Sequence, residues 1–171
     1  MSGELRNENG EANAFTYKGS PDKDGVKCIQ MGVIGNAEAK PVFSAWLNGI
    51  RLKTSIVAET DKYFHFVLTY DKQAGKEFIY INGNLEAERI ESRNIADVVI
   101  VGSNTEAKFN AFDGSPVCNP WCIGAYMNTS GQTGSLAWNG KIAVCRVYSE
   151  TLDPSEIIQS YNALVSPLEE K

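Results

Sequence analysis

Pairs of turn-forming residues divide this chain into short segments, and they constrain its fold more than any other feature. The pairs are Asp24-Gly25, Gly35-Asn36, Asn48-Gly49, Asn82-Gly83, Asp113-Gly114 and Asn139-Gly140. Asn, Asp and Gly tolerate positive φ and therefore favour tight reversals of the chain. The segments between them are rich in Val, Ile, Phe, Tyr and Thr, which favour strands. This pattern predicts an all-β fold, an antiparallel sandwich of short strands.

Two of these turns join strands in hairpins. Residues 42–47 and 50–53 flank Asn48-Gly49, and residues 76–81 and 85–88 flank Asn82-Gly83. A two-residue Asn-Gly loop suits the type I′ turn, whose twist matches that of paired strands. In the first hairpin, alternation predicts one face with Phe43, Ala45 and Leu47 and an opposite face with Ser44, Trp46 and Asn48.

Other strands and one helix follow. The segment 63–70 would be apolar on both faces of a strand, which predicts a central strand. Three more strands are predicted over 96–101, 121–127 and 140–148, with a polar loop over 103–119. Asp153-Pro154-Ser155-Glu156 has the acid, proline and glutamate of a capped helix start. Ile157, Ile158, Tyr161 and Leu164 then form one apolar stripe, and Pro167 is expected to end the helix. This short helix should dock on the sandwich.

Length and composition narrow the class of protein. A chain of 171 residues with 43% hydrophobic residues can form one domain with its own core. We expect a polar segment over 1–25 (a loop or a divergent first strand), the sandwich over 26–166 and a tail over 167–171. The net charge of −5 disfavours nucleic acid as a partner, and no apolar run approaches the roughly 18 residues of a membrane-spanning helix.

The four cysteines leave several arrangements open. Cys28, Cys118, Cys122 and Cys145 could form two disulfides, in any of three pairings, or remain thiols. Cys28 and Cys145 each lie in an apolar stretch and are expected to be buried thiols. Cys118 and Cys122 are close enough for a loop disulfide, which would indicate an oxidising compartment.

Two blocks of sequence carry a specific series of motifs. Residues 63–71 read YFHFVLTYD and are followed by Gly75 and by YING at 80–83. Residues 138–148 read WNGKIAVCRVY, preceded by Ile123-Gly124 and followed by Leu152, Glu156-Ile157 and Tyr161-Asn162-Ala163. In this order the blocks resemble the laminin-G-like, concanavalin A-like domains over about residues 63–164. Tyr63 stands where that family usually has Trp, and Ala143 and Val144 stand where it usually has acidic residues.

The resemblance implies a jelly-roll sandwich from a secreted or cell-surface bacterial protein, one module of a longer multidomain chain. No export signal is recognisable in the opening residues, and the family's opening strand is not evident before residue 60. We therefore expect a domain of a longer exported protein whose role is non-catalytic binding, with glycans or surface proteins as partners. A structural or adhesion spacer and, less favoured, a glycoside hydrolase or polysaccharide lyase are the alternatives.

Aromatic residues are the candidates for ligand contact. Sugar recognition uses aromatic faces and planar amides, and loops on a rigid sandwich often carry such residues. The candidates are Trp46 on its polar face and Phe109, Phe112 and Trp121 in or beside the long loop. Trp138 is expected to pack in the core.

No catalytic constellation is visible in the sequence. The chain has one histidine, His65, which is expected to be a core residue hydrogen-bonded to backbone. Glu86, Glu88 and Glu91 lie on a hairpin arm at the wrong alternation for a three-carboxylate glycosidase strand. Calcium is the one candidate cofactor; Asp22, Asp24 and Asp113 lie in turn-rich segments that could supply oxygen ligands, although each is also an ordinary turn residue.

Overall fold

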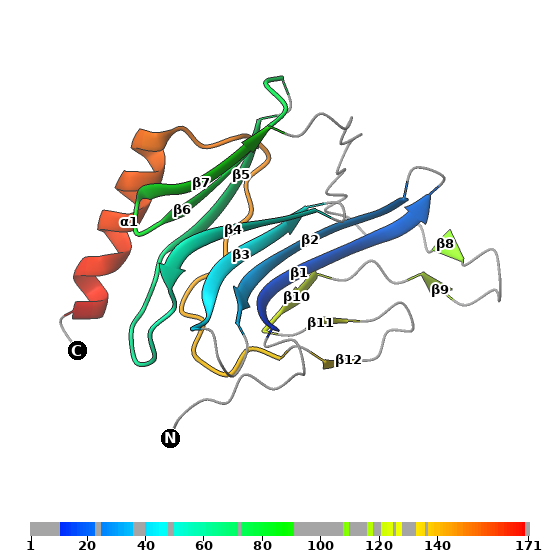
Figure 1. Ribbon diagram of the computed structural model, residues 1–171, viewed down its shortest axis with the longest axis horizontal. Helices are drawn as coiled ribbons and strands as arrows, with labels where there is room; N and C mark the ends of the chain where they lie inside the picture. Colours follow the sequence, from blue (N-terminus) through cyan, green and yellow to red (C-terminus); the bar gives the residue numbers. More distant parts are fainter. Residues whose placement is uncertain are drawn as a thin grey trace.

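The described part of the chain is mostly β-structure with a C-terminal helix (Figure 1). The computed structural model describes residues 11–22, 25–35, 40–47, 50–71, 73–90, 108–109, 116–117, 121–124, 126–127, 133–135 and 137–169. Two antiparallel sheets of five and three strands provide the framework. The prediction of an all-β fold with one C-terminal helix is therefore confirmed.

The larger sheet has the strand order β10-β1-β2-β3-β4. Its strands are β1 (Glu11–Asp22), β2 (Gly25–Ile34), β3 (Val42–Leu47), β4 (Ile50–Val57) and β10 (Trp121–Ile123). Leu47 pairs with Ile50, which is the register expected for the predicted hairpin; residues 48–49 lie outside the described residues. Within the segment 1–25, residues 11–22 form β1, which pairs with both β2 and β10, whereas residues 1–10 lie outside the described residues.

The smaller sheet consists of β5 (Phe66–Asp71), β6 (Lys76–Ile81) and β7 (Asn84–Ile90). The β6–β7 hairpin turns at Asn82 and Gly83, whose φ angles are 52° and 81°. Two consecutive positive φ values are typical of the predicted type I′ turn. The Asn82 side chain accepts a hydrogen bond from the backbone N–H of His65 at 2.9 Å, and the Asn82 backbone N–H donates to the His65 carbonyl at 2.8 Å. This pair of bonds ties the turn to the chain entering β5.

The core lies between the two sheets. Phe43 and Ala45 of β3 pack in one buried cluster with Ile79 and Ile81 of β6. The Phe43 ring also contacts the rings of Phe64 and Phe66, with centroids 4.9 and 5.4 Å apart. The predicted core position of Trp138 is confirmed, since it packs against this cluster.

β5 is an edge strand, not the central strand predicted over 63–70. It is apolar on both faces because its sheet is a middle layer. Phe66 and Leu68 pack against the core cluster, and Figure 1 shows the helix α1 (Pro154–Glu169) along the opposite side of the sheet. Tyr80 of β6 is buried on that second face.

The predicted start of α1 is confirmed, but its predicted end is wrong. Asp153 Oδ1 accepts hydrogen bonds from the backbone N–H groups of Ser155 and Glu156 at 2.7 and 2.9 Å. Glu156 Oε2 accepts from the Asp153 N–H at 2.9 Å, which completes a capping box. The helix continues through Pro167 to Glu169, although a proline within a helix has no N–H to donate and its ring crowds the carbonyl of the residue four positions earlier. Over the described residues, no helix has both the length and the apolar character needed to cross a membrane.

The segment after residue 107 differs from expectation. Two-residue strands β8 (Lys108–Phe109) and β9 (Pro116–Val117) pair within the predicted loop. The strand predicted over 121–127 is divided at Gly124, which has a φ of 79°, into β10 and β11 (Tyr126–Met127); β11 pairs with β12 (Thr133–Ser135). The strand predicted over 140–148 is not formed, because those residues have no ladder partner among the described residues. The strand predicted over 96–101 lies outside the described residues.

Candidate functional site

One face of the five-stranded sheet carries polar residues around Trp46. Gln30, Trp46 and Arg51 are consecutive cross-strand partners on β2, β3 and β4, and Ser44 is opposite Lys53. These residues alternate with Phe43, Ala45 and Leu47, which are buried toward the other sheet. The predicted alternation of β3 is thus confirmed. We call Gln30, Ser44, Trp46, Arg51 and Lys53 the polar face.

Trp46 is half-buried and held in place by its neighbour. The guanidinium carbon of Arg51 lies 4.4 Å from the centroid of the Trp46 ring, a cation–π contact. The indole N–H is buried and has no hydrogen-bond partner among the described residues. Because Arg51 occupies one side of the ring, a ligand would meet the other side or the ring edge. Gln30 and Arg51 were not among the predicted contact residues, although the predicted Asn48-Gly49 hairpin already implies that residues 46 and 51 are opposite one another.

The structure does not gather the other predicted contact residues with Trp46. Trp121 is in β10, where it is opposite Tyr17 in a register row that continues to Ile29 and Leu47. That row is adjacent to the row of Trp46, and alternation assigns the two rows to opposite faces of the sheet. Phe109 is in β8, opposite Pro116. Phe112 lies outside the described residues.

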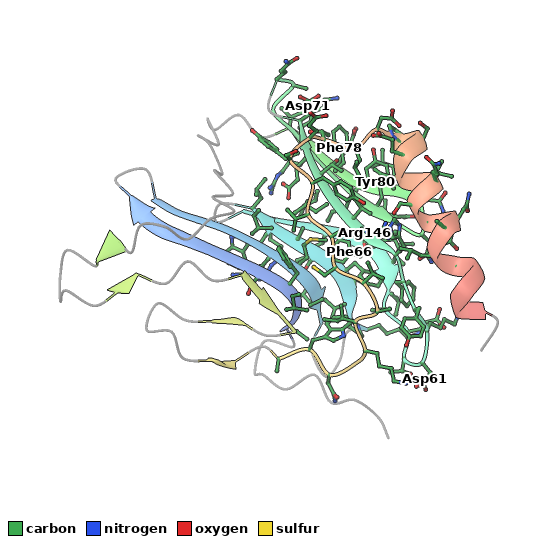
Figure 2. All side chains as sticks on the ribbon, turned by 180° about the vertical axis from the view of Figure 1, so that it is seen from behind. Asp61, Phe66, Asp71, Phe78, Tyr80 and Arg146 are labelled. Atoms are coloured by element: carbon green, nitrogen blue, oxygen red, sulfur yellow. The ribbon has the colours of Figure 1, made fainter. Side chains whose placement is uncertain are left out.

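A second candidate site is a cavity of about 450 Å³ between the two sheets. We call it the inter-sheet cavity. Phe15, Ile29, Met31 and Leu47 line it from the five-stranded sheet, and residues 66–70 of β5 line it from the other. Residues of the segment 144–152 and of α1 complete the wall. Phe66 and Arg146, both labelled in Figure 2, are among the residues that line this cavity.

Residues 139–150, which we call the strap, are exposed along their length. Before the strap, the backbone N–H of Trp138 donates to the Gly124 carbonyl at 2.8 Å. After it, the Thr151 hydroxyl donates to the Tyr70 carbonyl at 2.8 Å. Apolar strap side chains remain in contact with solvent, with Val144 46% and Val147 49% exposed. Cys145 is exposed as well and forms no disulfide with any described residue, so its predicted burial is wrong. The side chains of Cys28, Cys118 and Cys122 are outside the described set.

His65 lines the inter-sheet cavity beside Arg146. Its ring lies against Tyr161 of α1, with centroids 5.9 Å apart. The imidazole Nδ1 is buried with no hydrogen-bond partner among the described residues, so the predicted side-chain bond to backbone is not found there; Asn82 binds the backbone of His65 instead. Burial, and to a smaller extent the positive charge of Arg146, lowers the pKa of His65 below its ordinary 6.5. The cavity therefore holds a neutral imidazole next to a guanidinium at neutral pH.

The predicted carboxylates lie in separate places or outside the described part of the chain. Glu77 is fully buried and forms an ion pair with Arg89, whose guanidinium also donates to the Arg51 carbonyl at 3.2 Å. Glu86 occupies a register shift of β7 and Glu88 is opposite Phe78. No three His, Cys, Asp or Glu residues converge within the described ranges. Asp22 ends β1, whereas Asp24, Asp113 and Glu91 lie outside those ranges.

Comparisons with known proteins give a structural match at low identity and low TM-score. No protein-family model and no curated protein matches the chain. Among solved structures, the chain is similar to residues 221–444 of an S-layer domain-containing protein from Clostridium thermocellum. The two share 15% sequence identity with a TM-score of 0.43, over 94% of this chain and 67% of that chain.

Proposed function

We propose that this chain is a non-catalytic carbohydrate-binding module of a secreted or cell-surface protein, with the concanavalin A-like jelly-roll connectivity that its sequence resembles. The observation that carries the proposal is Trp46 in the middle of the polar face, with an amide and two cations as neighbours. An aromatic ring stacks on the C–H surface of a sugar, and a planar amide such as Gln30 offers both donors and acceptors to hydroxyl groups.

The geometry of the polar face supports this role. The face lies on a five-stranded sheet, which is a rigid support for its side chains. The cation–π contact with Arg51 restricts the Trp46 ring to one orientation, and this lowers the entropy cost of ordering it on binding. Lys53 is exposed, so the face is accessible from solvent at the β4 side. Ligand binding at this face requires no change in the core.

Glycan-array binding of the purified chain, with and without calcium, tests the proposal. We expect at least one glycan hit, and we expect Trp46→Phe and Gln30→Ala to weaken it by about tenfold or more, as for a central contact residue. Tyr63→Ala is the matched control, because Tyr63 is an exposed aromatic residue that is not in the five-stranded sheet of the polar face. If Trp121→Ala abolished glycan binding while Trp46→Phe left it unchanged, the site would lie in the β10 region, and the proposal for the polar face would be contradicted.

Two other outcomes would replace the proposed function. An array without hits for a folded chain would favour the structural or adhesion spacer. Release of reducing sugar from a polysaccharide, lost in Glu86→Gln or Glu88→Gln, would indicate a glycoside hydrolase. The inter-sheet cavity plays no part in this proposal, because it lies behind the opposite face of the same sheet.

A further inference from the structure

The inter-sheet cavity has the size of a small-molecule site. Its volume of about 450 Å³ falls within the range of about 300–1,000 Å³ that is typical of ligand pockets. Its walls are apolar where the sheets face each other, with Met31 and Leu47 on one side and Phe66 and Leu68 on the other. An apolar group placed between these walls would be removed from water on two sides.

The strap leaves apolar surface available at the same place. Val144 and Val147 line the cavity and are about half exposed, although the strap is anchored on both flanks. Covering such surface is favourable by roughly 25 cal/mol per Å². An apolar ligand in the cavity would therefore gain contacts from the strap as well as from the sheets.

The charged residues that line the cavity indicate which polar group a ligand would carry. Arg146 lines the cavity and has no ion-pair partner among the described residues. The adjacent His65 is neutral at physiological pH and has no bonded partner for Nδ1 within the described ranges. Glu150 also lines the cavity, and it forms no ion pair with Arg146. A guanidinium beside apolar walls is complementary to a carboxylate attached to an apolar body.

We propose that the inter-sheet cavity binds an amphipathic carboxylate, with its apolar body between the two sheets and its carboxylate on Arg146. This site is separate from the polar face. Its occupant differs from a sugar in having a long apolar part, so the two sites can be tested independently on the same protein.

Titration of the chain with octanoate tests this site, with octan-1-ol as the uncharged probe. His65 is the one histidine of the chain, so its imidazole proton resonances report on the cavity without further labelling. We expect octanoate to shift these resonances saturably and to bind more tightly than octan-1-ol. We expect Arg146→Gln to weaken octanoate binding by about tenfold, corresponding to about 1.4 kcal/mol, and to leave octan-1-ol binding unchanged.

Lys141→Gln is the matched control, because Lys141 is an exposed cation of the strap that does not line the cavity. This variant should bind octanoate as the parent chain does. Equal loss in both variants, or equal affinity for the acid and the alcohol, would overturn the carboxylate contact. The site would be overturned if octanoate left the His65 resonances unshifted and the strap amides of the ligand-free protein exchanged slowly. That result would show that the strap closes the cavity. A glycan hit is expected whatever the octanoate result.

Discussion

The β6–β7 hairpin and the strap are both short apolar segments, yet their surroundings differ sharply. In the hairpin Ile79 and Glu77 are completely buried, the turn is tied to His65, and Arg89 reaches the backbone of β4. In the strap Val144, Val147 and Tyr148 are about half exposed, and none of the described residues pairs with its backbone in a ladder. The two segments contain similar residue types. Apolar composition therefore does not by itself determine burial, which also requires a partner surface at the right place.

The hairpin finds its partners through short-range connections. Its two strands are joined by a two-residue turn, and α1 packs against that turn: a Cβ at Gly83 would lie 3.4 Å from Tyr161 Cδ1 and 3.5 Å from Ile158 Cγ1. For the strap, the hydrogen bonds to neighbouring segments that the described residues show are at its flanks, from Trp138 and Thr151. Substitutions in the hairpin should consequently affect the free energy of unfolding far more than matched substitutions in the strap.

The largest difference is expected between two arginines. Arg89→Gln leaves the buried Glu77 carboxylate without its ion-pair partner, and breaking a buried pair costs about 3–5 kcal/mol. Arg146→Gln removes an exposed side chain and should change the unfolding free energy by less than about 0.5 kcal/mol. Urea denaturation of both variants measures the difference. Equal destabilisation would show that the strap is packed as firmly as the hairpin.

A smaller difference is expected between two glycines with positive φ. Gly83→Ala should cost about 1–2 kcal/mol for the left-handed backbone, and its Cβ would also lie at the close end of van der Waals contact with α1, 3.4 Å from Tyr161 Cδ1. Gly124→Ala has a similar φ, and among the described residues its Cβ would meet only Ile142 Cδ1, at 3.9 Å, so it isolates the backbone cost more closely. Thermal unfolding monitored by circular dichroism should show the lower midpoint for Gly83→Ala. If the midpoint of Gly124→Ala falls as far, the approach of α1 to the turn contributes nothing.

The smallest effect concerns pH and the contact between the two regions. The pKa of His65 is lowered first by burial and then by Arg146, so the unfolded state binds the proton more readily than the folded state. The unfolding free energy should therefore decline as pH falls from 6.5 toward the folded-state pKa of His65. The His65→Gln variant should lack this part of the pH dependence between pH 7.5 and 5. Identical pH profiles for the two proteins would contradict the assignment of this titration to His65.

Much of the fold follows from local patterns. The Asn82-Gly83 hairpin, the alternation of β3 and the capping box at Asp153 were all predictable because each depends on residues within about one turn or one strand of each other. The corresponding hydrogen bonds and φ angles are present. The polar face was partly predictable for the same reason, since the hairpin register alone brings residues 46 and 51 together.

Features that depend on distant segments were not predictable. The apolar pattern of 63–70 indicates two covered faces but does not tell whether a strand or a helix covers each one; here β5 is an edge strand between a core and α1. The strand-like pattern of 140–148 does not indicate which strand would pair with it, and no described strand does. Burial of Cys145 failed as a prediction for the same reason.

The amino-acid sequence alone determined the β-rich class, the turns, the capped helix and the polarity of the Trp46 face, because these arise from backbone preferences and alternation over a few residues. Only the tertiary structure decided which strand lies at an edge, that Arg51 rests on Trp46, and that a cavity with Arg146 and His65 opens between the sheets. These features depend on which surfaces meet after the chain has folded. Residues far apart in sequence meet only through the packing of whole sheets, for which short-range patterns contain no information.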